Sequence, residues 1–313
     1  MTSMGKKALA IHGGAGTILR SEMSAELEAE YRAGLATALR AGWSVLERGG
    51  SALDAAEASV ASREDLPLFN AGRGSVFTAE GRNEMDAAVM DGSRLRAGAV
   101  AFVRNVRNPI RLARLVMERT DHVLLAGDGA NQFAAEAGVE TADDQYFFTQ
   151  HRWDQLQEAI AAGRVQLDHA AGSAAEPKSL GTVGAVACDG EGRLAAATST
   201  GGMTNKRFGR VGDSPLIGAG TYADELCAVS CTGHGEFFIL GATAYDVSAR
   251  MRYQQMNLEE ASTAAVARLS EIGGEGGLIA VDRLGNLSLP FNSDGMYRAF
   301  ISECEPARIE IYR

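Results

Sequence analysis

A threonine near the middle of the chain stands where loop-like composition changes into strand-like composition. Thr182 follows Gly181 and precedes the apolar run Val183–Ala187, whereas residues 161–181 carry few large apolar side chains. A threonine hydroxyl is a weak nucleophile at neutral pH unless a base lies beside it. The α-amino group of the same residue is such a base, because its pKa lies near ~7.7–8.0. Cutting the chain after Gly181 would therefore put nucleophile and base on one residue, although the segment also fits the plain start of a strand.

Hydroxyl-bearing residues and glycines are concentrated in a second segment, Thr198–Asn205. The runs Val183–Cys188 and Leu194–Ser199 flank a glycine-containing turn and so predict a hairpin. Antiparallel pairing would return Thr200 toward Thr182. A second hydroxyl would then lie beside the candidate nucleophile, unless the segment is only the end of a strand followed by a glycine turn.

The loop Gly209–Gly220 holds an arginine and an aspartate close together. Arg210 and Asp213 flank a glycine and precede Pro215, so we expect them on a stiff loop rather than on a helix face. Arginine binds a carboxylate through two parallel hydrogen bonds, and aspartate accepts from an ammonium group. The pair matches the two charged ends of an α-amino acid; the alternative is a loop ion pair worth about 0–1 kcal/mol.

A third polar segment, Ser230–Glu236, precedes a predicted helix. The hydroxyl of Thr232 and the backbone N–H of Gly233 could together form an oxyanion hole, since glycine allows a close backbone approach. Threonine followed by glycine is also common where a helix starts. His234 lies between two glycines of this segment, where it either tunes the choice of substrate or points away as part of the helix cap.

The bulk composition limits the possible partners. The chain has 313 residues, of which 46% are hydrophobic and 22% charged, and its net charge is −10. This charge argues against nucleic acid and anionic membranes as general partners, but one local arginine could still attract a small anionic substrate. The five histidines show no zinc-binding spacing. We therefore expect no catalytic metal and no organic cofactor.

The cysteines and the N-terminal residues point to a cytoplasmic protein. The four cysteines have no CxxC spacing, so buried free thiols in a reducing compartment are expected. The apolar run that follows Met1–Lys7 is too short for a signal peptide. No segment approaches the ~20 apolar residues that span a bilayer, so no membrane association is expected.

Periodicity and capping signals outline the elements of the first half. Ser24 can cap a long helix that glycines 49 and 50 end, and Ser51 with Asp54 can cap the next helix. The predicted elements are a strand at Ala8–His12 that leads into a turn at His12–Gly16, these two helices, short strands within Glu84–Val103 and a helix at Pro109–Arg119. Residues 161–181 then predict a mobile linker.

The second half predicts hairpins and helices in alternation. After the hairpin that Thr182 opens, helical patterns cover Glu236–Tyr253 and Leu258–Ile272, and a second hairpin joins Leu278–Val281 to Leu287–Leu289. Hairpin connections stand where a parallel sheet would need crossovers. The sequence therefore predicts an α+β architecture with mainly antiparallel sheets covered by helices.

Six long motifs in order make the chain resemble a known family. The motifs are Pro67–Gly72, Met90–Gly92, Gly181–Val186, Ala197–Lys206, Gly209–Pro215 and Ser230–Gly233, and the similarity extends from Ile11 to Tyr297. In these segments the chain resembles the plant-type asparaginase/isoaspartyl aminopeptidase family of N-terminal-nucleophile (Ntn) hydrolases. The resemblance implies an αββα sandwich that hydrolyses asparagine and β-aspartyl peptides and cleaves itself before the threonine.

The same resemblance implies how the chain is divided and assembled. Self-cleavage between Gly181 and Thr182 would yield an α subunit, 1–181, with the linker at its end, and a β subunit, 182–313. The two remain one folded domain, and two such pairs assemble into an (αβ)2 particle.

The resemblance also implies a role for each residue of the motifs. Thr182 is nucleophile and base, and Thr200 supports its activation. Arg210 holds the substrate α-carboxylate, and Asp213 with Gly235 holds the α-ammonium end. Thr232 and Gly233 form the oxyanion hole. Three further residues support the site: Asn70 lies close to the nucleophile, and Gly13 and Gly14 pack near the active centre.

A structural sodium ion is a further implication of the resemblance. The loop Arg63–Arg73 is similar to the family's sodium loop, in which backbone carbonyls wrap the ion; the oxygen donors would be those of Arg63, Glu64, Leu66, Phe69, Ala71 and Arg73. Hard oxygen ligands suit an alkali cation.

Two other functions compete with this interpretation. A glycosylasparaginase-like enzyme of the same superfamily shares the Thr198–Gly201 and Gly209–Pro215 elements. A nucleotide-binding module would use His12–Gly16 as a phosphate loop after the first strand, but its glycines match neither GxGxxG nor GxxxxGK[ST].

Overall fold

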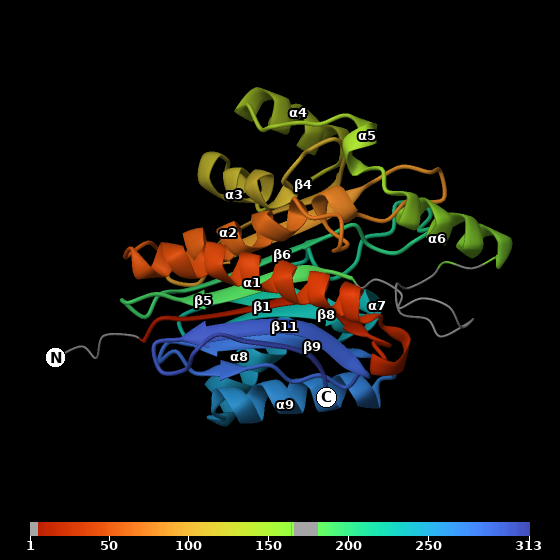
Figure 1. The fold of residues 1–313 in the computed structure, drawn as a ribbon. Coiled ribbons are helices and arrows are strands. Elements are labelled where there is room, and N and C mark those ends of the chain that lie inside the picture. The colour runs from red at the N-terminus through yellow and green to blue at the C-terminus, as the bar shows by residue number, and fades with distance from the viewer. Residues whose placement is uncertain (1–5, 164, 166–180) are drawn as a thin grey trace.

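Two β-sheets lie face to face between two layers of helices (Figure 1). The computed structural model of the chain describes residues 6–163, 165 and 181–313. Most of the linker predicted at 161–181 therefore lies outside the described residues. The strands are β1 (Ala8–Gly16), β2 (Met85–Asp91), β3 (Arg96–Val103), β4 (Leu124–Ala126), β5 (Val183–Cys188), β6 (Leu194–Thr200), β7 (Thr221–Ala223), β8 (Cys227–Gly233), β9 (Gly276–Asp282), β10 (Leu287–Ser288), β11 (Gly295–Ser302) and β12 (Arg308–Tyr312).

Among the described residues the strands form one eight-stranded and one four-stranded sheet. The orders are β12-β11-β1-β5-β6-β2-β3-β4 and β10-β9-β8-β7. The pairings are antiparallel apart from that of β3 with β4. Strands from both sides of Thr182 alternate in the larger sheet, since β1 and β2 flank the hairpin of β5 and β6. The predicted α+β class with mainly antiparallel sheets is confirmed.

Each sheet has its own helical layer. Helices α1, α2 and α3 cover the outer face of the larger sheet, and α8 and α9 cover the smaller one (Figure 1). The helices are α1 (Ala25–Glu47), α2 (Ala52–Glu64), α3 (Pro109–Arg119), α4 (Gly127–Ala137), α5 (Asp144–Phe147), α6 (Gln150–Ala161), α7 (Gly235–Gly241), α8 (Thr243–Gln254) and α9 (Leu258–Glu271), with 3-10 turns at Arg20–Glu22 and Gly72–Gly74. This arrangement is an αββα sandwich.

The predicted helix caps are present. The hydroxyl of Ser24 accepts a hydrogen bond from Leu27 N–H at 3.2 Å, and that of Ser51 accepts from Asp54 N–H at 3.1 Å. Each cap pairs one of the N–H groups that a helix start leaves without a partner within the helix. The starts of α1 and α2 were therefore predictable from the sequence.

Two element predictions are wrong. The expected turn at His12–Gly16 is the second half of β1, which continues past a register shift between His12 and Gly14 because it pairs with β11 along its whole length. The single helix predicted at Glu236–Tyr253 is two helices, α7 and α8. Ala242 breaks it, with a left-handed backbone at φ 44°.

Strand alternation separates two cores on the faces of the larger sheet. Along β1, Leu9 and Ile11 pack toward α1 and α2, whereas Ala8 and Ala10 face the smaller sheet. Side chains two residues apart share a face. The same rule places Thr182 on the face of Val186, which also packs between the sheets. The fold thus directs the candidate nucleophile into the space between the two sheets.

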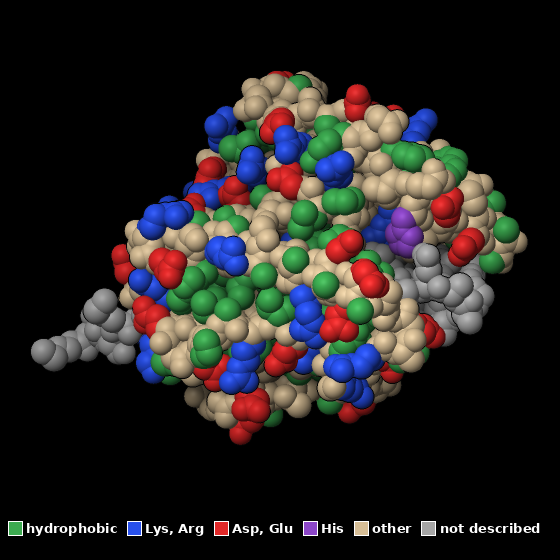
Figure 2. Space-filling model, viewed as in Figure 1, with side chains coloured by type: hydrophobic (Ala, Val, Ile, Leu, Met, Phe, Trp, Pro, Cys, Tyr) green, Lys and Arg blue, Asp and Glu red, His purple; other side chains and the backbone are tan. Residues whose placement is uncertain are grey.

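The surface carries no cluster of one charge on the face shown in Figure 2, where acidic and basic side chains are interspersed. Among the described residues, no helix is both long and apolar enough to cross a membrane.

All four cysteines are unpaired; Cys188, Cys227 and Cys231 are buried as expected, whereas Cys304 is exposed. The exposure of Cys304 corrects the expectation of four buried thiols, because its turn after β11 lies at the surface.

Candidate active site

The two candidate threonines meet at one end of the β5–β6 hairpin. Val183 pairs with Ser199 in the antiparallel register, so the residues just beyond the pair, Thr182 and Thr200, are neighbours. The hydroxyl of Thr182 donates to Thr200 Oγ1 at 3.2 Å, and Gly202 N–H donates to the same oxygen at 3.0 Å. The structure therefore brings these two residues together as the hairpin predicts.

A small cavity adjoins Thr182. Its lining residues are Gly181, Thr182, Thr200, Gly202, Met203, Arg210, Gly212, Asp213, Ser214 and Gly233. Its volume is about 20 Å³, which is close to the space of one water molecule. Gly181 and Thr182 both line it, so the peptide bond predicted to be cleaved lies at the cavity wall.

Arg210 is held in place by an acidic residue that the sequence did not single out. Its Nε and Nη2 donate to the two carboxylate oxygens of Glu236 at 2.9 and 3.0 Å. Glu236 lies in the first turn of α7 and is half exposed. One edge of the guanidinium is thus paired with Glu236, and the other edge carries Nη1. This nitrogen lies beside Gly212 on the cavity wall, where a Cβ added to Gly212 would be 2.9 Å from it.

Two buried oxygen atoms at the site have no hydrogen-bond partner among the described residues. They are Oδ2 of Asp213 and Oγ1 of Thr232. Buried polar atoms are normally paired, so each unpaired one asks for an explanation. A bound ammonium group and a developing oxyanion are partners of the correct kind. Asp213 lines the cavity at Thr182, whereas Thr232 does not line it but directly precedes Gly233, which does.

Burial also changes the acidity of the site. Desolvation raises the pKa of Asp213 to about 7, although the nearby Arg210 guanidinium opposes this shift. The carboxyl is therefore poised between its two protonation states near neutral pH. An arriving substrate ammonium would favour the charged form, since opposite charges lower a carboxyl pKa.

The glycines of the site allow close backbone approach. Gly233 has φ 145°, and a Cβ there would lie 2.3 Å from Glu275 O. A Cβ on Gly235 would lie 2.8 Å from Asp213 Oδ1 and 3.0 Å from Arg210 Nη2. Neither position has room for a side chain: Gly235 leaves space beside Arg210 and Asp213, and Gly233 allows β8 to lie close to the backbone of Glu275.

Asn70 braces the loop that follows Thr200. Its Nδ2 donates to Gly202 O at 2.8 Å, its Oδ1 accepts from Val76 N–H at 3.0 Å, and its backbone O accepts from Gly201 N–H at 3.0 Å. Asn70 therefore lies beside the threonine pair, where its hydrogen bonds support the loop that follows Thr200.

Gly13 and Gly14 follow the last residue of β1 that pairs with β5, so they run alongside the segment of Thr182. A Cβ on Gly13 would lie 2.5 Å from the Phe69 ring, and Gly14 has φ 120°.

His234 precedes α7 without a side-chain cap, and its ring packs edge-on against Phe237 at 5.7 Å between ring centroids. The ring of His234 thus belongs to the start of the helix.

Two further buried charged residues lie behind the threonine pair. Asp86 pairs with Thr200 across β2 and β6, and Lys206 Nζ donates to Glu84 O at 2.7 Å. Burial raises the pKa of Asp86 and lowers that of Lys206, while each charge partly offsets the shift of the other. The sequence contained no sign of this pair, because its members come from distant segments.

In the loop predicted to hold sodium, two glycines lie close against backbone carbonyl oxygens. A Cβ on Gly72 would lie 2.4 Å from Glu64 O, and one on Gly74 would lie 2.1 Å from Phe69 O. The carbonyls of Phe69 and Ala71 each accept one backbone hydrogen bond, which leaves a second lone pair on each oxygen. Among the described residues, no cluster of three His, Cys, Asp or Glu side chains could hold a metal. A cation in this loop would therefore have to be held by backbone oxygens, and the sodium site stays a prediction.

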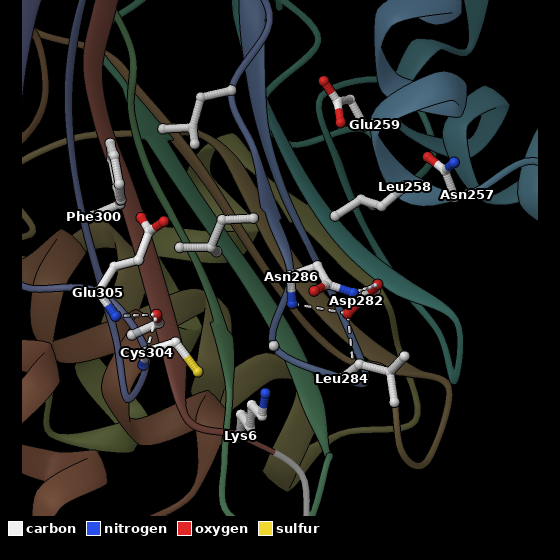
Figure 3. A pocket seen from close by; sticks show the side chains of 14 residues that line it. Lys6, Asn257, Leu258, Glu259, Asp282, Leu284, Asn286, Phe300, Cys304 and Glu305 are labelled. Carbon is white, nitrogen blue, oxygen red and sulfur yellow. Dashed lines mark hydrogen bonds between the residues drawn. The ribbon is translucent and has the colours of Figure 1, made fainter.

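A larger cavity of about 550 Å³ lies elsewhere, between the β9–β10 hairpin, the start of α9 and the end of β11 (Figure 3). It shares no lining residue with the cavity at Thr182. The Asp282 carboxylate on its wall is already engaged by Leu284 N–H, Asn286 N–H and the Asn286 side chain. The smaller cavity, where Thr200, Arg210 and Asp213 lie around Thr182, is therefore the better candidate for the active site.

Comparison with known proteins agrees with this geometry. The family described as asparaginase matches residues 5–311. The isoaspartyl peptidase of Salmonella typhimurium is 52% identical over 312 residues, covering 99% of this chain and 100% of the relative. The isoaspartyl peptidase of Escherichia coli is 51% identical and covers 99% and 97% of the two chains. The plant-type L-asparaginase of Pyrococcus abyssi is 44% identical and covers 95% and 96%.

The αββα sandwich, with a threonine at the start of a central strand, defines the class of Ntn hydrolases that the sequence motifs predicted. Within that class the chain belongs to the asparaginase family. The nucleotide-binding alternative is not supported, since His12–Gly16 is a buried strand rather than a phosphate loop.

Proposed function

We propose that this protein is a threonine-nucleophile hydrolase that releases aspartate from β-aspartyl dipeptides and from L-asparagine. The observation that carries the proposal is the convergence of Thr182 and Thr200 with Arg210 and Asp213 around one cavity. The names of the relatives, isoaspartyl peptidase and plant-type L-asparaginase, agree with this chemistry.

The proposed reaction is acyl transfer. After cleavage, Thr182 Oγ1 attacks the side-chain carbonyl carbon of the substrate while the Thr182 amine takes the hydroxyl proton. The C–N bond then breaks, and the amine returns that proton to the departing ammonia or amino acid. Water hydrolyses the ester on Thr182 and releases aspartate. No step requires an organic cofactor or a catalytic metal.

Two residues provide the clamp and two the oxyanion hole in this proposal. Arg210 binds the α-carboxylate through the guanidinium edge that Glu236 leaves open, and Asp213 binds the α-ammonium through its unpaired Oδ2. The hydroxyl of Thr232, which has no other partner in the described part of the chain, and the Gly233 N–H donate to the oxyanion. These donors act only as charge develops, so they lower the barrier rather than tighten substrate binding.

Kinetics with three substrates test the function. A β-aspartyl dipeptide, L-asparagine and an N-glycosylated asparagine are compared at equal enzyme concentration. We expect turnover of the first two. Preferential hydrolysis of the glycosylated substrate would support the glycosylasparaginase-like alternative, and no turnover of any of the three by cleaved protein would contradict the proposal.

Substitution of Thr232 with valine is expected to reduce kcat by about 10²–10³-fold with little change in KM, because it removes one oxyanion donor. Valine keeps the shape of the side chain, which is buried. Steady-state kinetics on cleaved protein measure the effect. A variant with unchanged kcat would exclude Thr232 from the oxyanion hole.

The pH dependence should reveal Asp213. Because burial raises the pKa of Asp213 to about 7, lowering the pH through 7 protonates this carboxyl and removes the charge that binds the ammonium. The Thr182 amine is also protonated below about pH 7.7–8.0. We therefore expect log(kcat/KM) to fall with a limiting slope of about two, whereas log kcat falls with a slope of about one, because only kcat/KM reports the free enzyme.

The matched control for this pH profile is Asp213→Asn, which should reduce the slope of log(kcat/KM) to about one. Equal slopes for kcat and kcat/KM in the wild type would contradict the role of Asp213.

We also propose that the Arg63–Arg73 loop binds a structural sodium ion. The ion would be held by backbone oxygens, and the remaining lone pairs on the carbonyls of Phe69 and Ala71, which each accept one backbone hydrogen bond, support this. A cation that binds only the folded protein raises its stability, so the melting temperature should be a few degrees higher in sodium chloride than in choline chloride at equal ionic strength. Equal melting temperatures would contradict the site.

The subunit arrangement and the compartment are part of the proposal. Fragments 1–181 and 182–313 should stay together after cleavage, since their strands alternate in one sheet, and two such pairs should form an (αβ)2 particle. Four unpaired cysteines agree with a reducing, cytoplasmic location. Light scattering of cleaved protein tests the assembly.

A further inference from the structure

A chain of buried hydrogen bonds runs between the two sheets, beside the candidate active site. His12 Nδ1 lies 3.0 Å from Thr182 O, and His12 Nε2 lies 2.9 Å from Ser230 Oγ. Ser230 Oγ lies 2.7 Å from Thr198 Oγ1, and Thr198 Oγ1 lies 2.6 Å from Thr221 Oγ1. The four side chains are fully buried and come from strands β1, β8, β6 and β7. We call these four side chains the buried relay.

The sheet register builds the relay around a glycine. His12 pairs with Gly184, and Gly184 pairs with Thr198, so the three residues form a row across β1, β5 and β6. A Cβ on Gly184 would lie 2.0 Å from Ser230 Oγ and 2.2 Å from His12 Nε2. The missing side chain thus makes the space in which Ser230, from the facing sheet, bridges histidine and threonine.

The direction of the hydrogen bonds follows from the atoms at the end of the relay. A carbonyl oxygen only accepts, so His12 Nδ1 must carry the proton that bonds Thr182 O. Burial, together with the nearby Arg63 guanidinium, lowers the pKa of His12 to about 3, so the ring is neutral. Its Nε2 is then a bare acceptor, to which Ser230 donates. The ring is held as one tautomer in one orientation.

The other end of the relay reaches the substrate clamp. Because Ser230 donates to His12, Thr198 donates to Ser230 and Thr221 donates to Thr198, which uses the single proton of Thr221. Its oxygen lies 2.9 Å from the backbone oxygen of Ser214, the residue after Asp213. The relay therefore runs from the backbone carbonyl of Thr182 to Thr221, which lies beside the loop that carries Asp213. Neither end involves an atom that reacts in the proposed mechanism.

We propose that His12 is a positioning residue, whose Nδ1–H holds the Thr182 carbonyl so that the Thr182 hydroxyl stays directed at Thr200 and the cavity. After cleavage Thr182 becomes a chain end, and chain ends fray unless they are tied down. The His12 bond then replaces part of the restraint that the peptide bond to Gly181 supplied. This inference rests on the proposed function, since it assigns His12 a task in the same reaction.

The test compares variants that remove or restore the Nδ1–H donor. His12→Leu fills similar space without a donor, and His12→Asn places an amide N–H near the position of Nδ1. Ser230→Ala removes the hydroxyl behind the ring. Ser262→Ala is the matched control, because Ser262 is an equally buried serine whose hydroxyl pairs with Ser288 outside the relay. Mass spectrometry counts the chains that begin with Thr182, and kcat is expressed per such chain.

We expect His12→Leu to lower kcat by about 10–100-fold with KM within about threefold, since small misplacements of a reacting group cost up to about 10²-fold. His12→Asn should recover most of the loss, Ser230→Ala should give an intermediate kcat, and Ser262→Ala should match the wild type in kcat. The rate of cleavage before Thr182 should follow the same order, because the same hydroxyl must be aligned.

Three outcomes would overturn the inference. They are an unchanged kcat in His12→Leu, equal losses in His12→Leu and His12→Asn, and a loss in Ser262→Ala as large as that in Ser230→Ala. Wild-type protein without activity on β-aspartyl dipeptides or asparagine would contradict the proposed function instead. In that case the order of the cleavage rates still tests His12, and if His12→Leu does not fold, Ser230→Ala and His12→Asn test it.

Discussion

Replacing Thr182 with alanine is expected to leave a single chain of 313 residues and to reduce hydrolysis by about 10⁴-fold or more. The substitution removes the hydroxyl that donates to Thr200. If Thr182 carries out its own cleavage, its hydroxyl attacks the Gly181 carbonyl during maturation, so the loss of this hydroxyl should prevent both cleavage and turnover. Denaturing electrophoresis, mass spectrometry and an ammonia-release assay measure the two effects.

Thr182→Ser is the matched control for this prediction. Serine retains the hydroxyl and, after cleavage, the α-amino group, so partial processing and partial activity are expected. Wild-type protein should separate into fragments 1–181 and 182–313. Cleavage before residue 182 in the alanine variant would refute self-processing by Thr182, and an intact wild-type chain that hydrolyses β-aspartyl dipeptides would refute the free amine as the base.

Replacing Arg210 with alanine is expected to raise KM strongly and to lower kcat/KM by about 30–1000-fold, which corresponds to the ~2–4 kcal/mol lost when one partner of a buried charge pair is removed. Two effects add. The substrate carboxylate loses its donor, and the Glu236 carboxylate, which Arg210 now binds at 2.9 and 3.0 Å, becomes an unpaired negative charge beside the substrate.

Two further variants separate these effects. Arg210→Ala combined with Glu236→Gln removes the repulsion, so its kcat/KM should lie above that of Arg210→Ala alone. Arg250→Ala is the control for loss of an ion-paired arginine, because Arg250 pairs with Asp246 on α8 at a similar partial exposure. Its kinetics should match the wild type. A KM for Arg210→Ala within twofold of the wild-type value would remove the clamp role.

The predictability of the site depended on how local each relationship was. The register of β5 and β6 needed only two strand patterns and a turn, so the proximity of Thr182 and Thr200 was foreseeable. Arg210 and Asp213 stand on one short loop and were found together. In contrast, Glu236 was passed over, although it lies in the segment quoted for Thr232, because an acidic residue at a helix start is ordinary.

The relay lay beyond sequence reasoning for a different reason. Its four members are spread over residues 12–230 and meet only because β1, β5 and β6 pair in one sheet while β7 and β8 face them from the other. In the sequence, His12 is considered for zinc spacing and as the first residue of the His12–Gly16 segment. Its actual partners are hydroxyls and a carbonyl, which carry no spacing signal at all.

The sequence alone determined the family and identified the candidate residues for the nucleophile, the clamp and the oxyanion hole, because these depend on contiguous motifs and on strand or helix periods. The tertiary structure alone decided which hydrogen bonds restrain them: the Arg210–Glu236 pair, the unpaired oxygens of Asp213 and Thr232, and the bond from His12 to Thr182. The physical reason is that a hydrogen bond requires atoms about 3 Å apart with fixed directions, and only the packing of distant strands sets such distances.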